Sequence, residues 1–337
     1  MTTPSFHVEK GPFLRDLQPG DRFVGFYVLR QKQLEPFRDP SRGVFLTLIV
    51  GDRSGQLIAR VWENAEETAA ELEPRTVIKL EGEIEMYLER RQVRVLRVRH
   101  AKEGEYDLRD MVPTSQRDPD EMRAELGAEI AKVGNPHLGQ LLHHFFDQDD
   151  FFARFAQSPA AKVVHHAYLG GLIEHVLEML RLCETVLAIY PQMDADLLRT
   201  GAILHDVGKL REFVWELDID YADEGQLLGH IVMTDEMITD ALAAMPDFPA
   251  ELALRLRHML LAHHGRYEYG SPRRPQTLEA IALHHIENLD AQINRFHLLL
   301  ERADPGETWT PYDRQLGRQL YAGQGDEYSV EERGFLE

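Results

Sequence analysis

The chain has 337 residues, of which 43% are hydrophobic and 28% charged, and a net charge of −20. This length allows two domains with separate cores, and the negative charge argues against a protein that binds polyanions through its overall charge. No apolar run reaches the roughly 20 residues that span a bilayer, no signal peptide is visible, and the single cysteine, Cys183, excludes an internal disulfide, so we expect a cytoplasmic protein with no membrane partner.

The charge is unevenly distributed along the chain. Residues 1–105 carry as many basic as acidic side chains, so the net charge belongs entirely to the residues after them. If the protein holds a phosphate backbone by charge, we expect the N-terminal part to do so. The acidic remainder is suited to attracting metal ions.

Five segments of the N-terminal part predict strands, because they are rich in Val, Ile, Phe and Tyr and are separated by Gly, Asp and Arg. They are residues 21–31, 43–52, 55–63, 76–87 and 91–99. Between the third and the fourth, residues 63–74 predict a short helix that ends at Pro74. This order is that of an OB-fold barrel, which we assign to residues 1–105; another small β-barrel is the alternative.

The rest of the chain predicts helices. Residues 106–158 are expected to form a linker and a helical lead-in, with Asp118 or Asp120 capping the first helix. Apolar residues spaced three and four apart then predict helices at 121–132, 136–156, 159–190, 194–206, 227–244, 249–264 and 275–300. The predicted fold class is therefore multidomain: a small all-β barrel followed by an all-α domain, with residues 311–337 as a C-terminal extension.

A histidine directly precedes an aspartate in the apolar stretch GAILHDVGKL, residues 201–210. Burying Asp206 without a partner is costly, and a metal ion would offset that cost, because imidazole and carboxylate suit Mn, Fe, Co, Ni or Zn. Further histidines stand beside apolar residues on or at the ends of other predicted helices: His175, His230, His263 and His264. A lone histidine of this kind is more often a hydrogen-bonded core residue, but the adjacent pair favours one metal site ringed by helices.

Five segments in order, behind the barrel, resemble the YhaM-type 3′–5′ exoribonuclease family. They are HHAYLGGLIEH (165–175), GAILHDVGKLRE (201–212), EGQLLGHI (224–231), LLAHHGRYEYGSP (260–272) and LEAIALHHIENLDA (278–291). That family joins an N-terminal OB-fold to a C-terminal HD-domain metal-dependent phosphohydrolase. The resemblance covers nearly the whole chain and implies an HD domain over residues 159–310.

The resemblance implies a set of metal ligands. It assigns ligand positions to His175, His205, Asp206, His230 and His263. The last ligand is Glu287 or Asp290, or both, because the ligand aspartate of many HD domains aligns with Glu287 whereas Asp290 matches a second one. The implied cofactors are two divalent transition-metal ions, Mn²⁺ before Co²⁺, Fe²⁺, Ni²⁺ or Zn²⁺, with Asp206 as their bridge.

Other residues of these segments are implied to act on the substrate. Lys209 would pair with a phosphate oxygen, with a solvated lysine as the alternative, and His264 is a further ligand or a phosphate contact in catalysis. His165 and His166 would contact the substrate or stand behind the ligands, with a structural role as the alternative. Three arginines after the His-His pair would add positive charge for a strand of phosphates: Arg266, Arg273 and Arg274.

The barrel is expected to hold a single strand through a positive groove and stacking aromatic rings. Arginines recur between residues 90 and 99, and we select Arg94 and Arg97 as phosphate contacts, with a solvated strand face as the alternative. Phe37, in the loop after the first strand, is the expected stacking residue. Phe45 and Tyr87 are stacking candidates that fit barrel core better, and Trp62 is expected in the core.

The implied reaction is metal-dependent hydrolysis of phosphodiester bonds in single-stranded RNA from the 3′ end. Single-stranded DNA as a further substrate and a homo-oligomeric state stay open. The alternative function is an OB-fold nucleic-acid-binding protein whose HD domain hydrolyses a small nucleotide or a cyclic dinucleotide. The GYP element that marks cyclic-di-GMP phosphodiesterases is absent, because RYEYGSPRRP follows the His-His-Gly segment.

Overall fold

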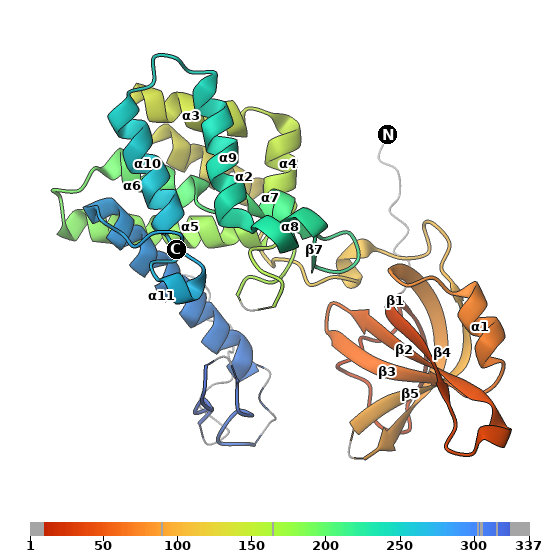
Figure 1. The fold of residues 1–337 in the computed structure, drawn as a ribbon. Helices are drawn as coiled ribbons and strands as arrows, with labels where there is room; N and C mark the ends of the chain where they lie inside the picture. The colour runs from red at the N-terminus through yellow and green to blue at the C-terminus, as the bar shows by residue number, and fades with distance from the viewer. Residues whose placement is uncertain are drawn as a thin grey trace. The chain divides into compact units, whose positions relative to one another are not determined.

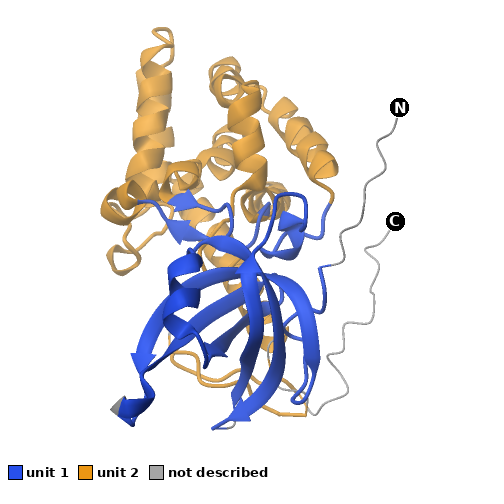
Figure 2. Ribbon diagram, turned by 90° about the vertical axis from the view of Figure 1, so that its right-hand side faces the viewer, with its two compact units in different colours: residues 1–117, 168–170, 213–222 blue, residues 118–167, 171–212, 223–337 orange. Residues whose placement is uncertain are grey.

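The computed structural model describes residues 10–323 apart from 89, 164, 302, 304, 305 and 315. The chain divides into two compact units: unit 1 consists of residues 1–117, 168–170 and 213–222, and unit 2 of residues 118–167, 171–212 and 223–337 (Figure 2). Residues 1–9 of the predicted barrel and 324–337 of the predicted extension lie outside the described residues.

Unit 1 contains a closed barrel of five strands (Figure 1). The strands are β1 (Arg22–Pro36), β2 (Val44–Asp52), β3 (Gly55–Val61), β4 (Thr76–Tyr87) and β5 (Arg90–His100), in the spatial order β1-β2-β3-β5-β4. Only the β3–β5 pair is parallel. The helix α1 (Ala65–Glu71) lies between β3 and β4 in the chain, as predicted. Leu46, Leu48 and Val50 alternate into the barrel core, as the two-residue period of a strand requires.

A short hairpin from the later part of the chain also belongs to unit 1. It consists of β6 (Phe213–Val214) and β7 (Asp220–Tyr221). Ile219 packs in an apolar cluster with Phe26 and Val28 of β1, Val77 of β4, and Met111 and Val112 beside the 3₁₀ helix η2 (Leu108–Asp110). The predicted helices leave residues 207–226 unassigned, and two-residue strands are too short to show an alternating pattern, so the sequence did not reveal this hairpin.

Unit 2 is helical. Its elements are α2 (Pro119–Ala131), α3 (Pro136–Phe146), α4 (Asp149–Gln157), α5 (Gly171–Ile189), α6 (Ala195–Leu204), α7 (Lys209–Glu212), α8 (Asp223–Leu228), α9 (His230–Ala243), α10 (Ala250–Ala262) and α11 (Leu278–Glu301). Capping side chains fix several starts: Asp118 accepts from the amides of Asp120 and Glu121, and Asn135 and Asp194 cap α3 and α6. Of the two predicted caps of α2, Asp118 is the one that forms.

Three predicted helices are divided or shortened. The predicted helix 136–156 breaks at Asp147–Gln148, where α4 starts with two acidic residues of its own. The predicted helix 159–190 begins only at Gly171. Pro159 holds Ser158 in an extended conformation, which ends α4. The predicted helix 227–244 is split by Gly229, whose φ of 75° is the left-handed conformation that favours glycine.

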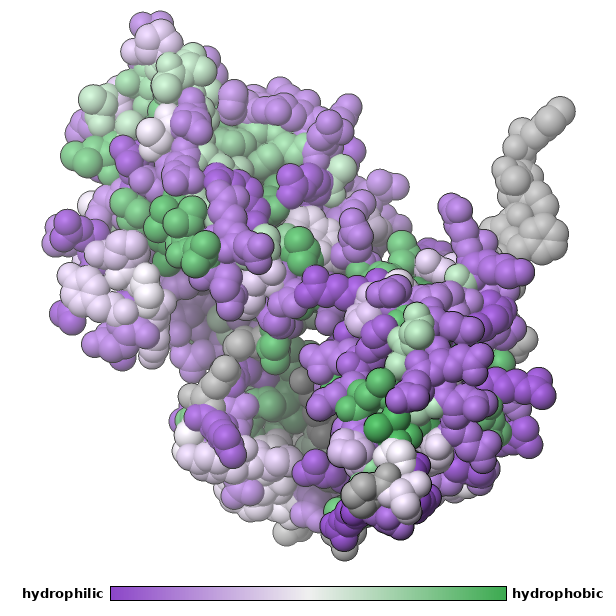
Figure 3. Space-filling view, turned by 45° about the vertical axis from the view of Figure 1, so that its right-hand side comes forward, coloured by the Kyte–Doolittle hydropathy of each residue, from purple (hydrophilic) through white to green (hydrophobic). Residues whose placement is uncertain are grey.

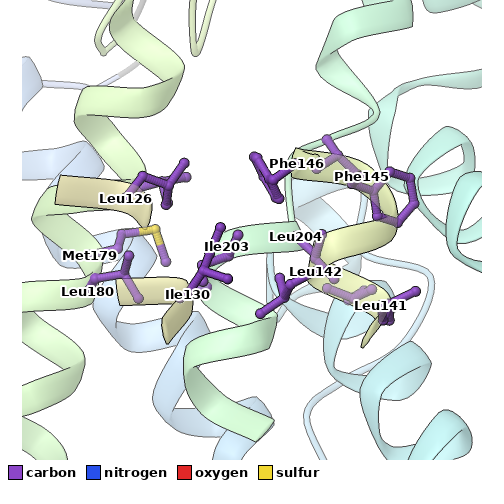
Figure 4. Close-up of a cluster of buried hydrophobic side chains, with 14 of the residues drawn as sticks. Leu126, Ile130, Leu141, Leu142, Phe145, Phe146, Met179, Leu180, Ile203 and Leu204 are labelled. Atoms are coloured by element: carbon purple, nitrogen blue, oxygen red, sulfur yellow. The ribbon is translucent and has the colours of Figure 1, made fainter. Parts of the chain in front are cut away.

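The core of unit 2 lies between the amphipathic faces of its helices. Figure 4 shows side chains of α2, α3, α5 and α6 pointing into one cluster, with Ile203 and Leu204 of α6 among them. Cys183 is fully buried there. On the face shown in Figure 3, hydrophilic side chains cover most of the surface and hydrophobic ones form small patches. None of the described helices is both long and apolar enough to cross a membrane.

Candidate active site

Helix ends and helix faces of unit 2 bring the predicted ligands together. His175 lies in the second turn of α5, and His205 and Asp206 follow the last residue of α6. His230 opens α9, and His263 and His264 follow α10. Glu287 and Asp290 lie on α11. Most of these residues are buried; the exceptions, His230 and His264, are partly buried. The predicted residues therefore come from five separate helices, and the structure brings them together.

Gly208 allows α9 to approach the His-Asp pair. A Cβ at this position would lie 2.3 Å from the carbonyl oxygen of His230, so only glycine fits. The Gly208 amide donates to Thr234 Oγ1, and that hydroxyl donates to the His205 carbonyl. The turn after α6 is thereby bonded to the first turns of α9, which fixes the position of His230 relative to Asp206.

The first ligand group consists of His175, His205 and Asp206, whose ligand atoms lie within 4.8 Å of one another. His175 Nε2 is 3.3 Å from His205 Nε2, and Asp206 Oδ2 is 3.1 Å from His205 Nε2. Two nitrogens that each lie about 2.1 Å from a shared ion are about 3.0–3.4 Å apart at the usual ligand angles. The spacing of the two imidazoles fits one common ion.

The second ligand group consists of His230, His263 and His264, again with ligand atoms within 4.8 Å of one another. Asp206 Oδ1 is 3.5 Å from His230 Nε2 and 3.8 Å from His263 Nε2. The two oxygens of Asp206 therefore face different ligand groups. Its carboxylate lies between them, as a bridging ligand would.

Several buried polar atoms at this centre accept or donate no hydrogen bond among the described residues. They are both carboxylate oxygens of Asp206, Nε2 of His230 and of His263, and Oε2 of Glu287. Lys209 Nζ is only 2.5 Å from Asp206 Oδ2, but without hydrogen-bond geometry. Buried polar atoms without a partner destabilise a fold. A divalent cation would give these nitrogen and oxygen atoms a partner, and their chemistry suits such an ion.

The opposite ring nitrogen of each histidine is held by an acceptor. Nδ1 of His205, His263 and His264 lies 2.9, 2.6 and 2.8 Å from the carbonyl oxygens of Ala202, Leu260 and Tyr269. Nδ1 of His175 is 2.6 Å from Asp290 Oδ2, and Nδ1 of His230 is 2.9 Å from Glu212 Oε1. Carbonyl and carboxylate oxygens only accept, so each Nδ1 donates and each Nε2 keeps its lone pair for the centre.

Sequence reasoning missed Glu212. Its carboxylate, 6% exposed, also accepts from the backbone amide of His230 at 3.0 Å, so it holds the ring and the start of α9 together. Its place beside the apolar Leu210 and Phe213 was a signal for burial. In each group, Nδ1 of one histidine donates to a carboxylate: His175 donates to Asp290, and His230 donates to Glu212.

Glu287 and Asp290, left open by the sequence, differ in their surroundings. Glu287 Oε1 lies 3.6 Å from His264 Nε2 and 3.9 Å from His263 Nε2, and burial raises the pKa of Glu287 to about 7. Asp290 instead accepts from His175 and from His166 Nε2, at 3.1 Å for the latter. Burial alone would raise the pKa of Asp290, but these hydrogen bonds hold it well below its ordinary value.

His166 lies behind the first ligand group. It is fully buried with a φ of 44°, its amide donates to Asn294 Oδ1 of α11, and its Nε2 is 3.4 Å from Glu178 Oε2. Burial disfavours its charged form, yet Asp290 and Glu178 raise the pKa of His166 to about 9. The ring centroid of His165 lies 5.6 Å from that of His175, about as far as the 5.4 Å of His166, and its buried Nδ1 has no partner among the described residues.

The predicted phosphate contacts of unit 2 differ in burial. Lys209 is 5% exposed, so the alternative of a solvated lysine is wrong. The three predicted arginines are all exposed: Arg266, Arg273 and Arg274. They occupy the loop that follows His264. Burial lowers the pKa of the His264 imidazole to about 4.

On the barrel, the predicted phosphate contacts are charge-paired. Arg94 lies 2.7 Å from Glu83 and 2.6 Å from Glu85, and Arg97 lies 3.9 Å from Glu81. A groove of about 720 Å³ runs beside these arginines and includes Trp62, Lys79 and Arg99 in its lining. Phosphate binding there would have to compete with carboxylates of the neighbouring strand.

The aromatic residues of the barrel correct three expectations. Phe45 is only partly buried and does not belong to the barrel core, since its neighbour Leu46 faces that core. Trp62 is 39% exposed and not core, and its ring centroid lies 5.8 Å from that of Phe37 and 5.1 Å from that of Phe45. Tyr87 is 57% exposed and also not core. The sequence could not show this, because Trp62 follows the last residue of β3 and the strand's alternation no longer decides where it points.

Removing the carboxylate of Glu212 is expected to weaken metal binding by about 10- to 100-fold, the usual effect of losing such an outer hydrogen bond. Without it, the ring of His230 is free to rotate. Isothermal titration of the metal-free Glu212→Ala variant with Mn²⁺ measures this. Glu212→Gln keeps an acceptor oxygen and should retain more affinity; equal, wild-type affinity in both variants would contradict the role.

Comparisons with known proteins agree with this geometry. The model of the HD domain family matches residues 172–292. The chain is 35% identical over 298 residues to the 3′–5′ exoribonuclease YhaM of Shouchella clausii, covering 87% of this chain and 91% of the relative. The proteins of the same name from Bacillus licheniformis and Bacillus subtilis are 37% and 36% identical over 266 and 265 residues, with 78% of this chain and 83% of each relative covered. The chain therefore belongs to the YhaM 3′–5′ exoribonuclease family and is a metal-dependent hydrolase, a nuclease of the HD class.

Proposed function

We propose that this chain hydrolyses single-stranded RNA from the 3′ end and releases nucleotides one at a time. The observation that carries the proposal is the carboxylate of Asp206, which stands between two histidine groups with no hydrogen-bond partner for either oxygen. The name of the relatives supports the substrate and the direction. Single-stranded DNA is a second candidate substrate, to be compared with RNA. A cytoplasmic location and a homo-oligomeric state are further predictions.

Two groups of residues would hold two divalent ions, with Mn²⁺ as the first candidate. His175, His205 and Asp206 would hold one ion; Asp206, His230, His263, His264 and Glu287 would hold the other. Asp290 would position His175, because its Oδ2 is engaged by His175 and His166; these three residues are also close enough together to hold an ion, so Asp290 stays the alternative last ligand. When bound, such ions make water a stronger nucleophile and neutralise charge on phosphoryl oxygens.

The side chains of the protein would place the substrate and its charges. Lys209 is buried beside Asp206, so its ammonium group would stabilise a phosphoryl oxygen in a medium where charge interactions are strong. The acceptors behind each Nδ1 would keep the imidazoles from turning as the substrate enters. His165, with an unpaired Nδ1, would donate to or accept from the substrate.

The experiment that tests this function uses 5′-labelled single-stranded RNA and DNA with Mn²⁺ and with chelator. We expect the RNA to shorten in single steps only when Mn²⁺ is present, and a 3′-terminal hairpin to stall the reaction. Cleavage of a circular RNA would contradict an exonuclease. Hydrolysis of a cyclic dinucleotide in place of RNA would favour the alternative function.

Replacing Arg94 and Arg97 by alanine is expected to weaken binding of long single strands and to flatten its salt dependence. Each lost phosphate contact lowers the slope of log K against log salt by about 0.7. Cleavage of a dinucleotide should be unchanged, because both arginines lie in unit 1 and the ligand groups lie in unit 2. Filter binding at several salt concentrations measures this.

The control is Arg109→Ala, which removes an arginine of unit 1 that is also paired with a carboxylate, Asp107. An unchanged slope in the double variant would mean that Glu81, Glu83 and Glu85 keep both arginines from phosphate. The strand would then be held elsewhere on the barrel, most directly by Phe37 and the rings it contacts.

A further inference from the structure

The loop that follows His264, residues 265–274, has a fixed conformation; we call it the tyrosine loop. Ser271 is 3% exposed, and its hydroxyl lies 3.1 Å from the Leu261 carbonyl of α10 and 2.7 Å from the Arg273 carbonyl. The Ser271 amide donates to the Arg266 carbonyl at 3.1 Å. The loop is thus bonded to α10 and across its own base, so its side chains project from a defined backbone.

Two aromatic rings of this loop face solvent. Tyr267 is 55% exposed and Tyr269 is 54% exposed, although large apolar rings are stabilised by burial. The guanidinium carbon of Arg274 lies 5.1 Å from the ring centroid of Tyr267, and that of Arg266 lies 5.7 Å from the ring centroid of Tyr269. Each exposed ring therefore has a cation beside it.

The charge of the tyrosine loop opposes that of the chain. It contains Arg266, Arg273 and Arg274 against a single carboxylate, Glu268, in a protein with a net charge of −20. None of these four side chains forms an ion pair within the part of the chain that the structure describes. Unpaired guanidinium groups beside exposed rings suit a ligand that carries both phosphates and flat bases.

The tyrosine loop is bonded directly to the second ligand group. The carbonyl oxygen of Tyr269 accepts from His264 Nδ1 at 2.8 Å, and the amide of Arg266 donates to the His264 carbonyl at 2.9 Å. His264 Nε2 in turn lies with the ligand atoms of His230 and His263. His264 thus connects the loop that carries the exposed rings to the second ligand group.

We propose that Tyr267 and Tyr269 stack on bases at the 3′ end of the substrate while the loop arginines pair with its phosphates. The loop would then seat the terminal nucleotides so that a phosphodiester bond lies at the ligand groups. Stacking does not depend on which base is present, so this seat accepts any sequence. The inference rests on the proposed function and names the residues that bind the substrate end.

The test compares a short single-stranded RNA with the same RNA lacking the bases of its three 3′-terminal nucleotides. KM and kcat for release of the first nucleotide are measured with Mn²⁺ for wild type, Tyr267→Ala, Tyr269→Ala and the two Tyr→Phe variants. Each alanine variant should raise KM for the normal RNA about 5-fold or more, with kcat little changed. KM for the base-free RNA should stay as in wild type, and phenylalanine should restore KM.

Tyr190→Ala is the matched control, since this tyrosine of unit 2 is 49% exposed and lies outside the loop. Unchanged KM in both alanine variants would overturn the inference, as would an equal rise for both RNAs or a loss of bound metal. If wild-type protein does not shorten the normal RNA with Mn²⁺, the proposed function itself fails.

Discussion

Replacing Asp206 by alanine is expected to lower RNA hydrolysis on the order of 10³-fold or more, as removal of one member of a catalytic unit does. Asp206 faces both ligand groups, so its loss would affect both of the proposed ion sites at once. Binding of long single strands should persist, because the barrel of unit 1 has its own core and contributes none of the ligands. Single-turnover hydrolysis and filter binding with chelator measure the two effects separately.

Two further variants make this result interpretable. Asp206→Asn keeps the volume of the side chain but loses its charge, and it should be nearly as inactive as the alanine variant. Asp240→Ala removes an exposed aspartate of α9 and should leave hydrolysis unchanged. Near-normal hydrolysis by Asp206→Ala would show that the reaction takes place elsewhere.

Removal of metal is expected to stop hydrolysis and to lower the melting temperature by several degrees. About two ions per chain should be found by elemental analysis of protein purified without chelator. A ligand that binds only the folded state and is present at about 100 times its Kd stabilises the fold by about 2.7 kcal/mol. We expect the ions to bind the folded state because atoms of Asp206, His230 and His263 there have no hydrogen-bond partner. Melting with and without Mn²⁺ measures this independently of activity.

The double variant His205→Ala/His263→Ala removes one ligand from each group and serves as the control. Its melting temperature should not respond to Mn²⁺. Protein that contains no metal and melts at the same temperature in Mn²⁺ and in chelator would contradict the two-ion centre, whatever its activity.

The barrel and the ligand residues were predictable because their signals are local. The five strands are each seven residues or longer and rich in Val, Ile, Phe and Tyr, and their order with a helix before the fourth strand predicted the topology. The His-Asp pair and the other histidines stand in short segments with a fixed order. Each of these features is visible without knowledge of a contact between distant residues.

What could not be predicted depends on contacts between distant parts of the chain. Glu212 and Glu178 are single acidic residues whose roles appear only when His230 and His166 lie against them. Glu287 and Asp290 share a helix face, and only the structure shows that they lie near different histidines, Glu287 near His264 and Asp290 near His175. The helix ends at Pro159 and Gly229 were visible as residues, but apolar spacing on both sides concealed the breaks.

The placement of β6 and β7 in unit 1 has a consequence for synthesis on the ribosome. Phe26, Val28 and Val77 leave the exit tunnel well before Ile219 has been translated, although all four belong to one apolar cluster. Because domains fold as they emerge, N-terminal first, the nascent barrel presents part of this cluster to the cytosol until the hairpin arrives. During that interval we expect the exposed apolar residues to attract chaperones and to favour aggregation of neighbouring nascent chains. A slow codon or an arrest peptide placed before residue 213 would prolong the exposure, and crosslinking at Phe26 would reveal what covers it.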